Sequence, residues 1–599
     1  MRRRTVQYLV LLSLLAVSVH LYFNHADPFA TPEWMDKEFD LGPDRYRDNV
    51  GGPPAKAKAK PPTRPPSRPS RPFRAPLPAD VRKRDAVVDA FKHAWSAYER
   101  DAMGADEYHP LSHRGSNLGA GGGIGYTVVD ALDTMLLMGL DAEYARAREW
   151  VAEELSFDQP GHYSTFETTI RVLGGLLSAY HLSGDALYLR HATDLGERLL
   201  PAFGALLPSP AVDLRARRGS GAGTVGVADA TTLQLEFRYL AQLTGRAEFW
   251  HKAEGVMRVV NKARLPNGLA PISVGGDGAF ARSTIRMGSN GDSYYEYLLK
   301  QYLQTNQTEP VYLQMYADAM RGVHAHLLTP ALSPRSDSDS DSPANAKETE
   351  TGGALYIAEL LPVPGALRDW RTSWDAQPKQ EHLACFLAGA LMLGAATAHR
   401  APAASPGVSR PPHDAELTET GRADWAAGVG VLEGCLDTTR TRTGLAPEGF
   451  NFRTARDPGP PAPPGEERAW YIKGAGQPGA PPYDARYMLR PEISESLFLA
   501  WRLTGAPRYR AAAWDLFSAI ERHCRLPGGG YATVLDVGAL PVVYGDKQET
   551  FFLSETLKYL FLTFADEGVL DLGEVVLNTE AHPLPIFNPS ITPLFTEYA

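Results

Sequence analysis

Carboxylates that recur inside apolar segments of helical periodicity are the clearest chemical feature of this sequence. In "SNGDSYYEY", Asp292 and Glu296 lie four residues apart and would share one face of a helix. Acids occupy comparable positions at Asp130, Asp133, Glu167, Glu492, Glu495, Glu555 and Glu580. Each alone could be a helix cap or a surface charge, and Glu167 with Arg171 could be an ordinary pair one helical turn apart.

Taken together, these acids indicate a functional site. Buried carboxylates without partners cost several kcal/mol each, so a fold would not accumulate them without a compensating ion or substrate. The sequence therefore predicts a ring of acids with few cations. Such a ring suits either a hard metal ion or paired acid–base catalysis on a polar substrate.

Other kinds of chemistry find little support in the sequence. The glycine-rich stretch "GAGGGIG" (119–125) follows no strand pattern and lacks the GK[ST] sequence of a phosphate-binding loop. The formal net charge is −10, from 70 acidic and 60 basic residues, which argues against binding nucleic acid. Three cysteines are too few for a disulfide scaffold, although one disulfide and one free thiol are compatible with an oxidising compartment.

The elements that must position these acids read as helices. A weak repeat, seen in "LSGDALYLRHA", "LTGRAEFWHKA" and "LTGAPRYRAAA", ends one helix at a glycine and places an aromatic residue and an alanine four and eight positions later. Glycine supplies the left-handed residue that ends a helix, so each copy predicts a helical hairpin. Hairpins repeated over most of the chain predict an all-α toroid of paired helices, because a closed ring needs no capping repeats.

The N-terminal segment suggests a membrane-anchored protein. Three arginines precede an uncharged apolar run and no small-residue cleavage site follows it, although a cleaved signal peptide is the alternative. We expect a single-pass type II protein of the endoplasmic reticulum or Golgi membrane, with a glycosylation acceptor at Asn306. The predicted parts are a cytosolic tail (1–5), a signal-anchor helix (6–23), a proline-rich lumenal stem (24–83) and one folded domain (84–599) with disordered insertions near 332–353, 400–414 and 456–468.

Eight long motifs, among them "VDALDTMLLMGL", "FETTIRVLGG", "GDSYYEYLLKQYLQ", "LRPEISESLFLAWRLTG" and "NTEAHPLPI", resemble the class I α-1,2-mannosidases of glycoside hydrolase family 47. The resemblance covers residues 84–588 in the same motif order. It implies an (α/α)7 barrel that requires Ca²⁺, inverts the anomeric configuration and trims terminal α-1,2-linked mannose from high-mannose N-glycans. We expect a monomer with glycoprotein glycans, not nucleic acid, as its partners.

The resemblance also implies roles for single residues. Glu167 matches the candidate general acid, Asp292 a further acid/base candidate, Glu492 the base that activates water, and Glu448 another carboxylate of the site. Thr579 matches the protein ligand of calcium, with Glu495, Glu555 and Glu580 around the ion's waters. Phe551 matches the aromatic residue on which the terminal sugar stacks, while Arg171, His382 and Arg490 match residues of the site floor. Cys385 and Cys435 match a disulfide pair, which leaves Cys524 as a buried thiol.

Two positions depart from the family pattern. Asn290 stands where the endoplasmic-reticulum enzymes carry an arginine that restricts cleavage to one glycan branch, and Asp229 stands where a glutamate commonly helps to bind the glycan. These departures predict a broader branch preference, closer to that of Golgi or fungal enzymes. The alternatives are a non-catalytic glycan-binding factor of glycoprotein degradation and a membrane-tethered scaffold. Intact Glu167, Asp292, Glu492 and Thr579, with the cysteine pair, favour the enzyme.

Overall fold

The computed structural model describes residues 76–598, apart from 205, 222, 332–353, 366–372, 403–408 and 462–467. The predicted tail, the anchor and nearly all of the stem lie outside these residues, as does the first predicted insertion. Contacts divide the chain into residues 1–66 and 67–599, and every described residue belongs to the second unit. Within the described ranges, no helix is both long and apolar enough to cross a bilayer.

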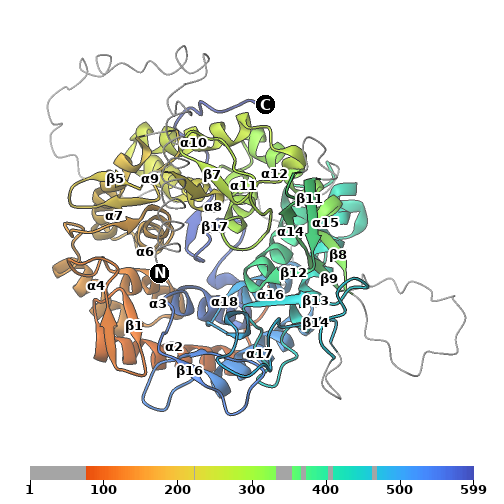
Figure 1. The fold of residues 1–599 in the computed structure, drawn as a ribbon. Helices are drawn as coiled ribbons and strands as arrows, with labels where there is room; N and C mark the ends of the chain where they lie inside the picture. Colours follow the sequence, from red (N-terminus) through yellow and green to blue (C-terminus); the bar gives the residue numbers. More distant parts are fainter. Residues whose placement is uncertain are drawn as a thin grey trace, which may run out of the picture. The chain divides into compact units, whose positions relative to one another are not determined.

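Seven of the helices in the described part of the chain are buried on almost every side and line the inside of a ring (Figure 1). Helix α14, with the sequence FLAGALMLGAAT, shows why: it is apolar all round, and such a helix is stable only when neighbours cover it completely. The inner helices are α3 (Tyr126–Met138), α6 (Gly174–Ser183), α9 (Gln234–Thr244), α11 (Asp292–Gln304), α14 (Phe386–Thr397), α16 (Glu492–Thr504) and α18 (Leu557–Phe564).

Seven amphipathic helices cover the inner ones, again counting only described residues. Gly184, Gly245 and Gly505 end inner helices with φ of 65–70°, and the aromatic residues four positions on are buried in the next outer helix. The predicted hairpin repeat is thus confirmed. The outer helices are α2 (Val81–Ala102), α4 (Asp141–Glu153), α7 (Ala186–Leu199), α10 (Ala247–Lys262), α12 (Pro310–His326), α15 (Glu419–Asp437) and α17 (Pro507–His523).

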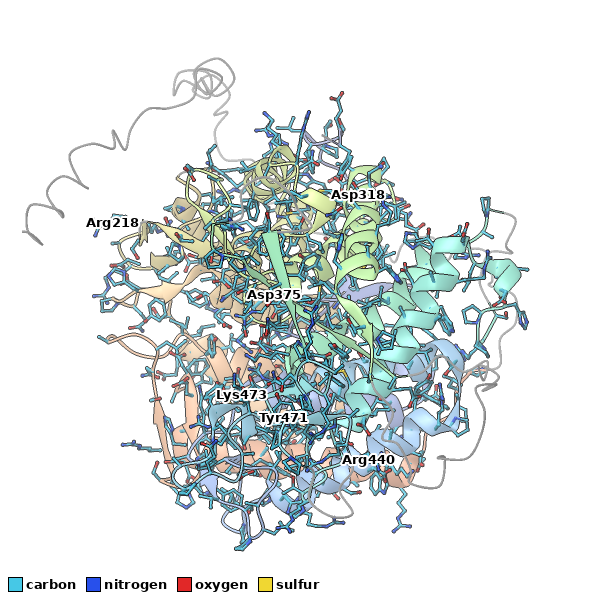
Figure 2. The ribbon with its side chains drawn as sticks, turned by 45° about the vertical axis from the view of Figure 1, so that its right-hand side comes forward. Arg218, Asp318, Asp375, Arg440, Tyr471 and Lys473 are labelled. Carbon is cyan, nitrogen blue, oxygen red and sulfur yellow. A yellow bond between two sulfur atoms is a disulfide. The ribbon has the colours of Figure 1, made fainter. Side chains whose placement is uncertain are left out.

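The ring closes on itself. Each inner helix contacts the next around the ring, and the turn before α18 contacts α3. Helix α2, the first described, packs against α18, the last, and begins at Val81, three residues before the expected domain start. The arrangement is the predicted (α/α)7 barrel, with charged side chains such as Arg218, Arg440 and Lys473 on its outer surface (Figure 2).

The expectation of an all-α fold was too simple, because short antiparallel sheets join the helices. The paired strands are β1 (Glu107–His109) with β2 (Arg114–Ser116); β3 (Tyr163–Ser164), β4 (Ala211–Asp213) and β5 (Arg218–Ser220); β6 (Thr224–Gly226) with β7 (Ser273–Gly275); β8 (Leu328–Pro330) with β9 (Leu355–Ile357); β10 (Glu359–Pro362) with β11 (Trp374–Gln377); β12 (Lys379–Glu381), β13 (Gly449–Phe452) and β14 (Trp470–Tyr471); β15 (Thr533–Val534) with β16 (Tyr544–Gly545); and β17 (Val575–Leu577) with β18 (Pro583–Pro585). Strand β17 lies inside the ring (Figure 1).

Short helical turns complete the connections. Two of them are π-helical, η2 (Thr168–Leu173) and η9 (Phe552–Thr556), a rare form that is frequent at functional sites. The others are α5 (Thr165–Glu167), α8 (Val227–Thr231), η3 (Leu200–Phe203), η4 (Pro266–Gly268), η6 (His382–Cys385), η7 (Asp414–Glu416), η8 (Tyr483–Ala485) and η10 (Glu567–Val569).

The cysteines and the described flanks of the insertions are tied to the barrel. Cys385 and Cys435 form the expected disulfide, and Cys524 is a buried free thiol whose pKa is raised by that burial. In the second insertion, Arg410 donates to Glu567 over 3.1 Å. The segments 403–408 and 462–467 lie outside the described residues, so the predicted disorder of the insertions stays a prediction.

Candidate active site

The turn between β17 and β18 carries Thr579 and Glu580 and is held from within by Asn578. The Asn578 side-chain oxygen accepts hydrogen bonds from the backbone N–H groups of Glu580 (2.9 Å) and His582 (2.8 Å). Its side-chain amide donates to the Ile170 carbonyl over 2.9 Å. Ala581 adopts φ of 58°, a strained left-handed conformation for alanine. These contacts fix the backbone of the turn and thereby the positions of Thr579 and Glu580.

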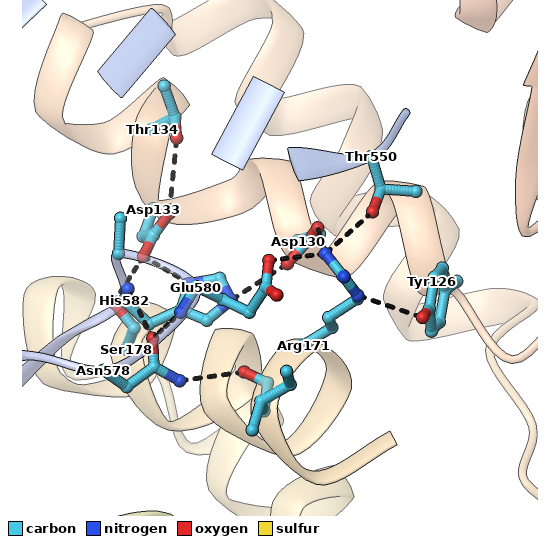
Figure 3. A network of polar contacts seen from close by, with 12 residues as sticks. Tyr126, Asp130, Asp133, Thr134, Arg171, Ser178, Thr550, Asn578, Glu580 and His582 are labelled. Atoms are coloured by element: carbon cyan, nitrogen blue, oxygen red, sulfur yellow. Dashed lines mark hydrogen bonds and ion pairs between the residues drawn. The ribbon is translucent and has the colours of Figure 1, made fainter. Parts of the chain in front are cut away.

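A fully buried ion network lies beneath this turn (Figure 3). His582 donates to Asp133 over 2.7 Å and to Asp130 over 3.0 Å. Lys558, which lies outside the close-up, contacts Asp133 at 2.8 Å and donates to the Ala581 carbonyl over 2.8 Å. Burial alone would lower the pKa of His582, but the charge of Asp133 and the hydrogen bonds to both aspartates raise it to about 9. Asp130 and Asp133 are therefore structural partners of buried cations.

Arg171 joins this network to the cleft. Its Nε donates to Glu167 over 2.9 Å and to the Tyr126 hydroxyl over 3.0 Å, while Nη1 reaches Glu580 and, over 3.3 Å, the Thr550 hydroxyl (Figure 3). The Glu167–Arg171 pair that the sequence suggested exists. Glu167 is the last residue of α5 and Arg171 lies in the π-helical turn η2, so the pair does not form within one regular α-helix.

A second, partly buried arginine neutralises Glu448. Arg490 donates to both oxygens of that carboxylate, over 3.0 and 2.6 Å, a bidentate arrangement of high directional specificity. Its guanidinium lies 5.5 Å from the centre of the Phe551 ring, and that of Arg171 lies 5.6 Å from the same ring. Leu489, immediately before Arg490, has φ of 65°. The expectation of few cations was thus wrong, because burial requires a counter-charge for most of these acids.

Glu492 and His382 face each other on the floor, where Arg490 Nη1 lies 3.8 Å from Glu492 Oε1. His382 Nε2 and Glu492 Oε2 are buried, 3.6 Å apart and without a hydrogen-bond partner in the described chain. Strand pairing of Glu381 with Gly449 brings His382 to this place, and its backbone N–H donates to the Glu448 carbonyl over 2.9 Å. Burial raises the pKa of Glu492 to about 7, and burial with the charge of Arg490 lowers that of His382 to about 3. A neutral imidazole and a carboxylate at this spacing could hold a water molecule between them.

Two of the remaining floor acids, Glu296 and Glu495, share one lysine. Lys300 Nζ contacts Glu296 and lies 3.5 Å from Glu495, so Glu296 is first of all an ion-pair partner. Burial raises the pKa of Glu495 and of Glu580 to about 8. For Glu555, in the π-helical turn η9, burial and the charge of Glu580 raise the pKa well above its ordinary value.

Such mutual repulsion is the condition that a bound cation relieves. Within the described residues, no three His, Cys, Asp or Glu side chains form a group that could hold a metal directly. Thr579 is half-buried beside this cluster, on a turn next to Glu580. One protein oxygen surrounded by acids fits a hard cation that keeps most of its water, so the donor set is compatible with Ca²⁺.

The rim predicted to set specificity assembles around Gly226. A Cβ built on this glycine would lie 2.9 Å from Asp229 Oδ2 and 3.0 Å from Asn290 Oδ1, so both side chains flank it closely. Asn290 is exposed, with φ of 65°. Burial and the charge of Glu167 raise the pKa of Asp229 to about 6. Burial, with the charges of Glu296, Asp229 and Glu381, raises the pKa of Asp292 to about 8.

A cavity of about 490 Å³ opens from this site. It combines four predicted residues, Glu167, Arg171, Arg490 and Phe551, with others that sequence reasoning missed. Those include Tyr126, Glu107, Lys547 and Glu549. The missed residues come from separate segments without a shared motif, and the only local signal was the charged pair flanking Gln548 in "DKQET".

Fold and site together define a class: a helical-barrel protein whose acidic floor is neutralised in part by buried cations. The chain belongs to glycosyl hydrolase family 47, whose profile matches residues 90–586. It is 36% identical over 544 residues to the endoplasmic reticulum mannosyl-oligosaccharide 1,2-alpha-mannosidase of Homo sapiens, covering 89% of this chain and 68% of that protein.

Two further comparisons agree. The protein of the same name from Schizosaccharomyces pombe is 37% identical over 525 residues, covering 85% of this chain and 90% of the relative. Among solved structures, the alpha-1,2-mannosidase from Trichoderma reesei superposes with a TM-score of 0.70 at 26% identity. That match covers 85% of this chain and all of the other.

Proposed function

We propose that this protein is an inverting exo-α-1,2-mannosidase that removes terminal α-1,2-linked mannose from high-mannose N-glycans of glycoproteins. Family membership supports the reaction. The observation that carries the mechanism is the pair of Glu492 Oε2 and His382 Nε2, which lie 3.6 Å apart without a hydrogen-bond partner among the described residues. Inversion requires a base that holds water on the face of the sugar opposite the acid.

The residues divide into a water side and a leaving side. On the water side, ionised Glu492 accepts the proton of the attacking water, which neutral His382 helps to orient. On the leaving side, Asp292 carries a proton near neutral pH, since its pKa is raised to about 8 by burial and neighbouring acids. Glu167 accepts hydrogen bonds from Arg171 and Tyr126. The structure thus supports Asp292 as the proton source, with Glu167, the family's candidate acid, as the alternative.

Thr579 would hold Ca²⁺ through its oxygens, and Glu495, Glu555 and Glu580 would hold the ion's waters. When bound, the ion would orient and polarise hydroxyl groups of the terminal mannose. The protein's own contribution is the fixed turn of Asn578–Ala581 and the Phe551 ring, against which the sugar can stack.

Incubating the purified protein with a nine-mannose glycan, with and without EDTA, tests this function. We expect release of β-mannose, seen by NMR before mutarotation, and its loss in EDTA with recovery on adding Ca²⁺. Full activity in EDTA would refute the calcium requirement, and release of α-mannose would refute inversion.

Substrates with different leaving groups separate the two candidate acids. α-Mannosyl fluoride needs little protonation to depart, so it should restore turnover to the variant that lacks the acid but not to Glu492→Gln. We expect rescue of Asp292→Asn. Rescue of Glu167→Gln alone would reassign the proton to Glu167.

We further propose a broad branch preference, because Asn290 stands at the position where the endoplasmic-reticulum enzymes carry an arginine. Mapping the first product from the nine-mannose glycan tests this, and clean arrest after loss of one middle-branch mannose would contradict it.

We also propose that residues 6–23 anchor a monomeric enzyme in the endoplasmic reticulum or Golgi membrane. The full chain in microsomes tests that placement, through its resistance to carbonate extraction and its protection from added protease. A change in gel mobility caused by a glycan on Asn306 would mark the lumenal side.

A further inference from the structure

Lys547 lies between two glutamates on the side of the cleft. Its Nζ is 3.0 Å from Glu107 and 3.2 Å from Glu549, and its side chain is 39% exposed. Glu107 and Glu549 are themselves 24% and 17% exposed. We call Glu107, Lys547 and Glu549 the charged wall. None of these residues has a role in the reaction outlined above.

The charged wall is rigidly mounted. His109 contacts the Asp546 carbonyl and the Ser116 hydroxyl, both at 2.8 Å, and Ser116 donates to Glu107 over 3.1 Å. The carbonyl of Lys547 accepts from the backbone N–H of Thr533 over 3.1 Å, which ties its segment to β15. Side chains held on braced backbone are those that can select a ligand by geometry.

The wall lines the outer part of the cleft. It faces the same cavity as Phe551, Arg171 and Arg490, whereas Glu492, Glu555 and Thr579 do not line that cavity. An enzyme that removes the terminal sugar must bury that sugar on the floor, so the inner sugars leave past the cavity walls. Leu118, 43% exposed, gives the same cavity an apolar surface for sugar C–H groups.

Stability alone gives little reason for the wall, because ion pairs at this exposure contribute little to folding. Its chemistry suits hydroxyl groups, since the ammonium retains donor capacity and both carboxylates retain acceptor capacity. We propose that the charged wall is a binding subsite for the mannose residues on the inner side of the cleaved bond. This inference rests on the proposed function, and it is separate from the rim at Asp229 and Asn290, which comes from other segments.

The test compares a full glycan with a ligand of one ring. For Lys547→Met we expect the KM of the nine-mannose glycan to rise about tenfold, through loss of charged hydrogen bonds, with kcat changed less than about twofold. The inhibition constant of the iminosugar deoxymannojirimycin, which occupies only the floor, should not change. Lys547→Gln, which keeps a neutral donor, should show a smaller rise in KM.

Arg246→Met is the matched control. Arg246 is also a half-exposed cation between two glutamates, Glu197 and Glu248, but it lies outside the cavity. It should leave both constants unchanged. An unchanged glycan KM in Lys547→Met, or an equal rise in the iminosugar constant, would overturn the inference. Calorimetry with the glycan distinguishes failure of this inference from failure of the proposed function. If the wild type does not bind the glycan, the proposed function is refuted. If the wild type and Lys547→Met bind it equally well, only the subsite is refuted.

Discussion

The floor of the cleft and its charged wall use the same residue types in opposite ways. On the floor, Lys558, His582 and Asp133 are fully buried. Ala581 and Leu489, in the same region, adopt strained left-handed backbone conformations. On the wall, Lys547 and its two glutamates remain partly in water. When a charged side chain is removed from the floor, its oppositely charged partner stays buried without a counter-charge or water. When one is removed from the wall, water can solvate the partner that remains. The floor should therefore tolerate little variation, and the wall should be free to adapt to the glycan.

The largest effect is expected from Glu492, whose Oε2 has no hydrogen-bond partner within the described residues. Glu492→Gln removes the base while keeping the shape of the side chain, so kcat should fall by about 10²–10⁴-fold with little change in glycan binding. Steady-state kinetics and calorimetry measure the two quantities. Glu433→Gln, on the outer surface, serves as the control. If Glu492→Gln retained wild-type kcat, the water side of the mechanism would have to be abandoned.

Stability should next separate the buried charges of the floor from half-exposed charges such as Arg246. Lys558→Met leaves Asp133 buried with one cation fewer, and the free energy of unfolding should fall by about 3–5 kcal/mol. Arg246→Met removes the half-exposed ion pair of Arg246 and Glu197, and the free energy of unfolding should fall by at most about 1 kcal/mol. Urea denaturation followed by tryptophan fluorescence compares them. Equal losses in both variants would contradict the difference between buried and half-exposed charges.

The pH dependence of kcat/KM should report the acid on the leaving side. Asp292 must be protonated to donate, and its pKa is raised to about 8 by burial and nearby acids, so raising the pH above that value removes the active form. We expect kcat/KM to fall about tenfold for each further pH unit. Asp292→Asn should be weakly active without this alkaline fall, and Asp229→Asn should retain it. A flat wild-type profile to pH 9.5 would exclude Asp292.

The smallest change concerns selectivity. Asn290→Arg should favour one glycan branch and slow the others several-fold, while total turnover on the preferred branch stays close to that of the wild type. Product mapping of a partial digest measures the order of cleavage. Gln307→Arg places the same charge at another exposed, left-handed position outside the cavity and should have no effect. An unaltered order in Asn290→Arg would separate branch preference from this rim.

Much of the architecture could be predicted because its signals are local. Apolar periodicity identified the inner helices, and the glycines at 184, 245 and 505 located the ends of three of them. The candidate acids were found because an acid inside an apolar helix is conspicuous in one segment. Their partners were not, since Lys558 and Asp133 are 425 residues apart and no local pattern joins them.

By itself, the sequence determined the helical character of the barrel, its hairpin repeat and the identity of most floor acids, because side-chain periodicity and helix caps act over a few residues. Only the tertiary structure decided which acids are neutralised by buried cations, that Arg171 and Glu555 lie in π-helical turns, and that Glu107, Lys547 and Glu549 meet on one wall. The physical reason is that burial and Coulomb interactions depend on distance in space. Ring closure brings together charges from segments that are far apart along the chain.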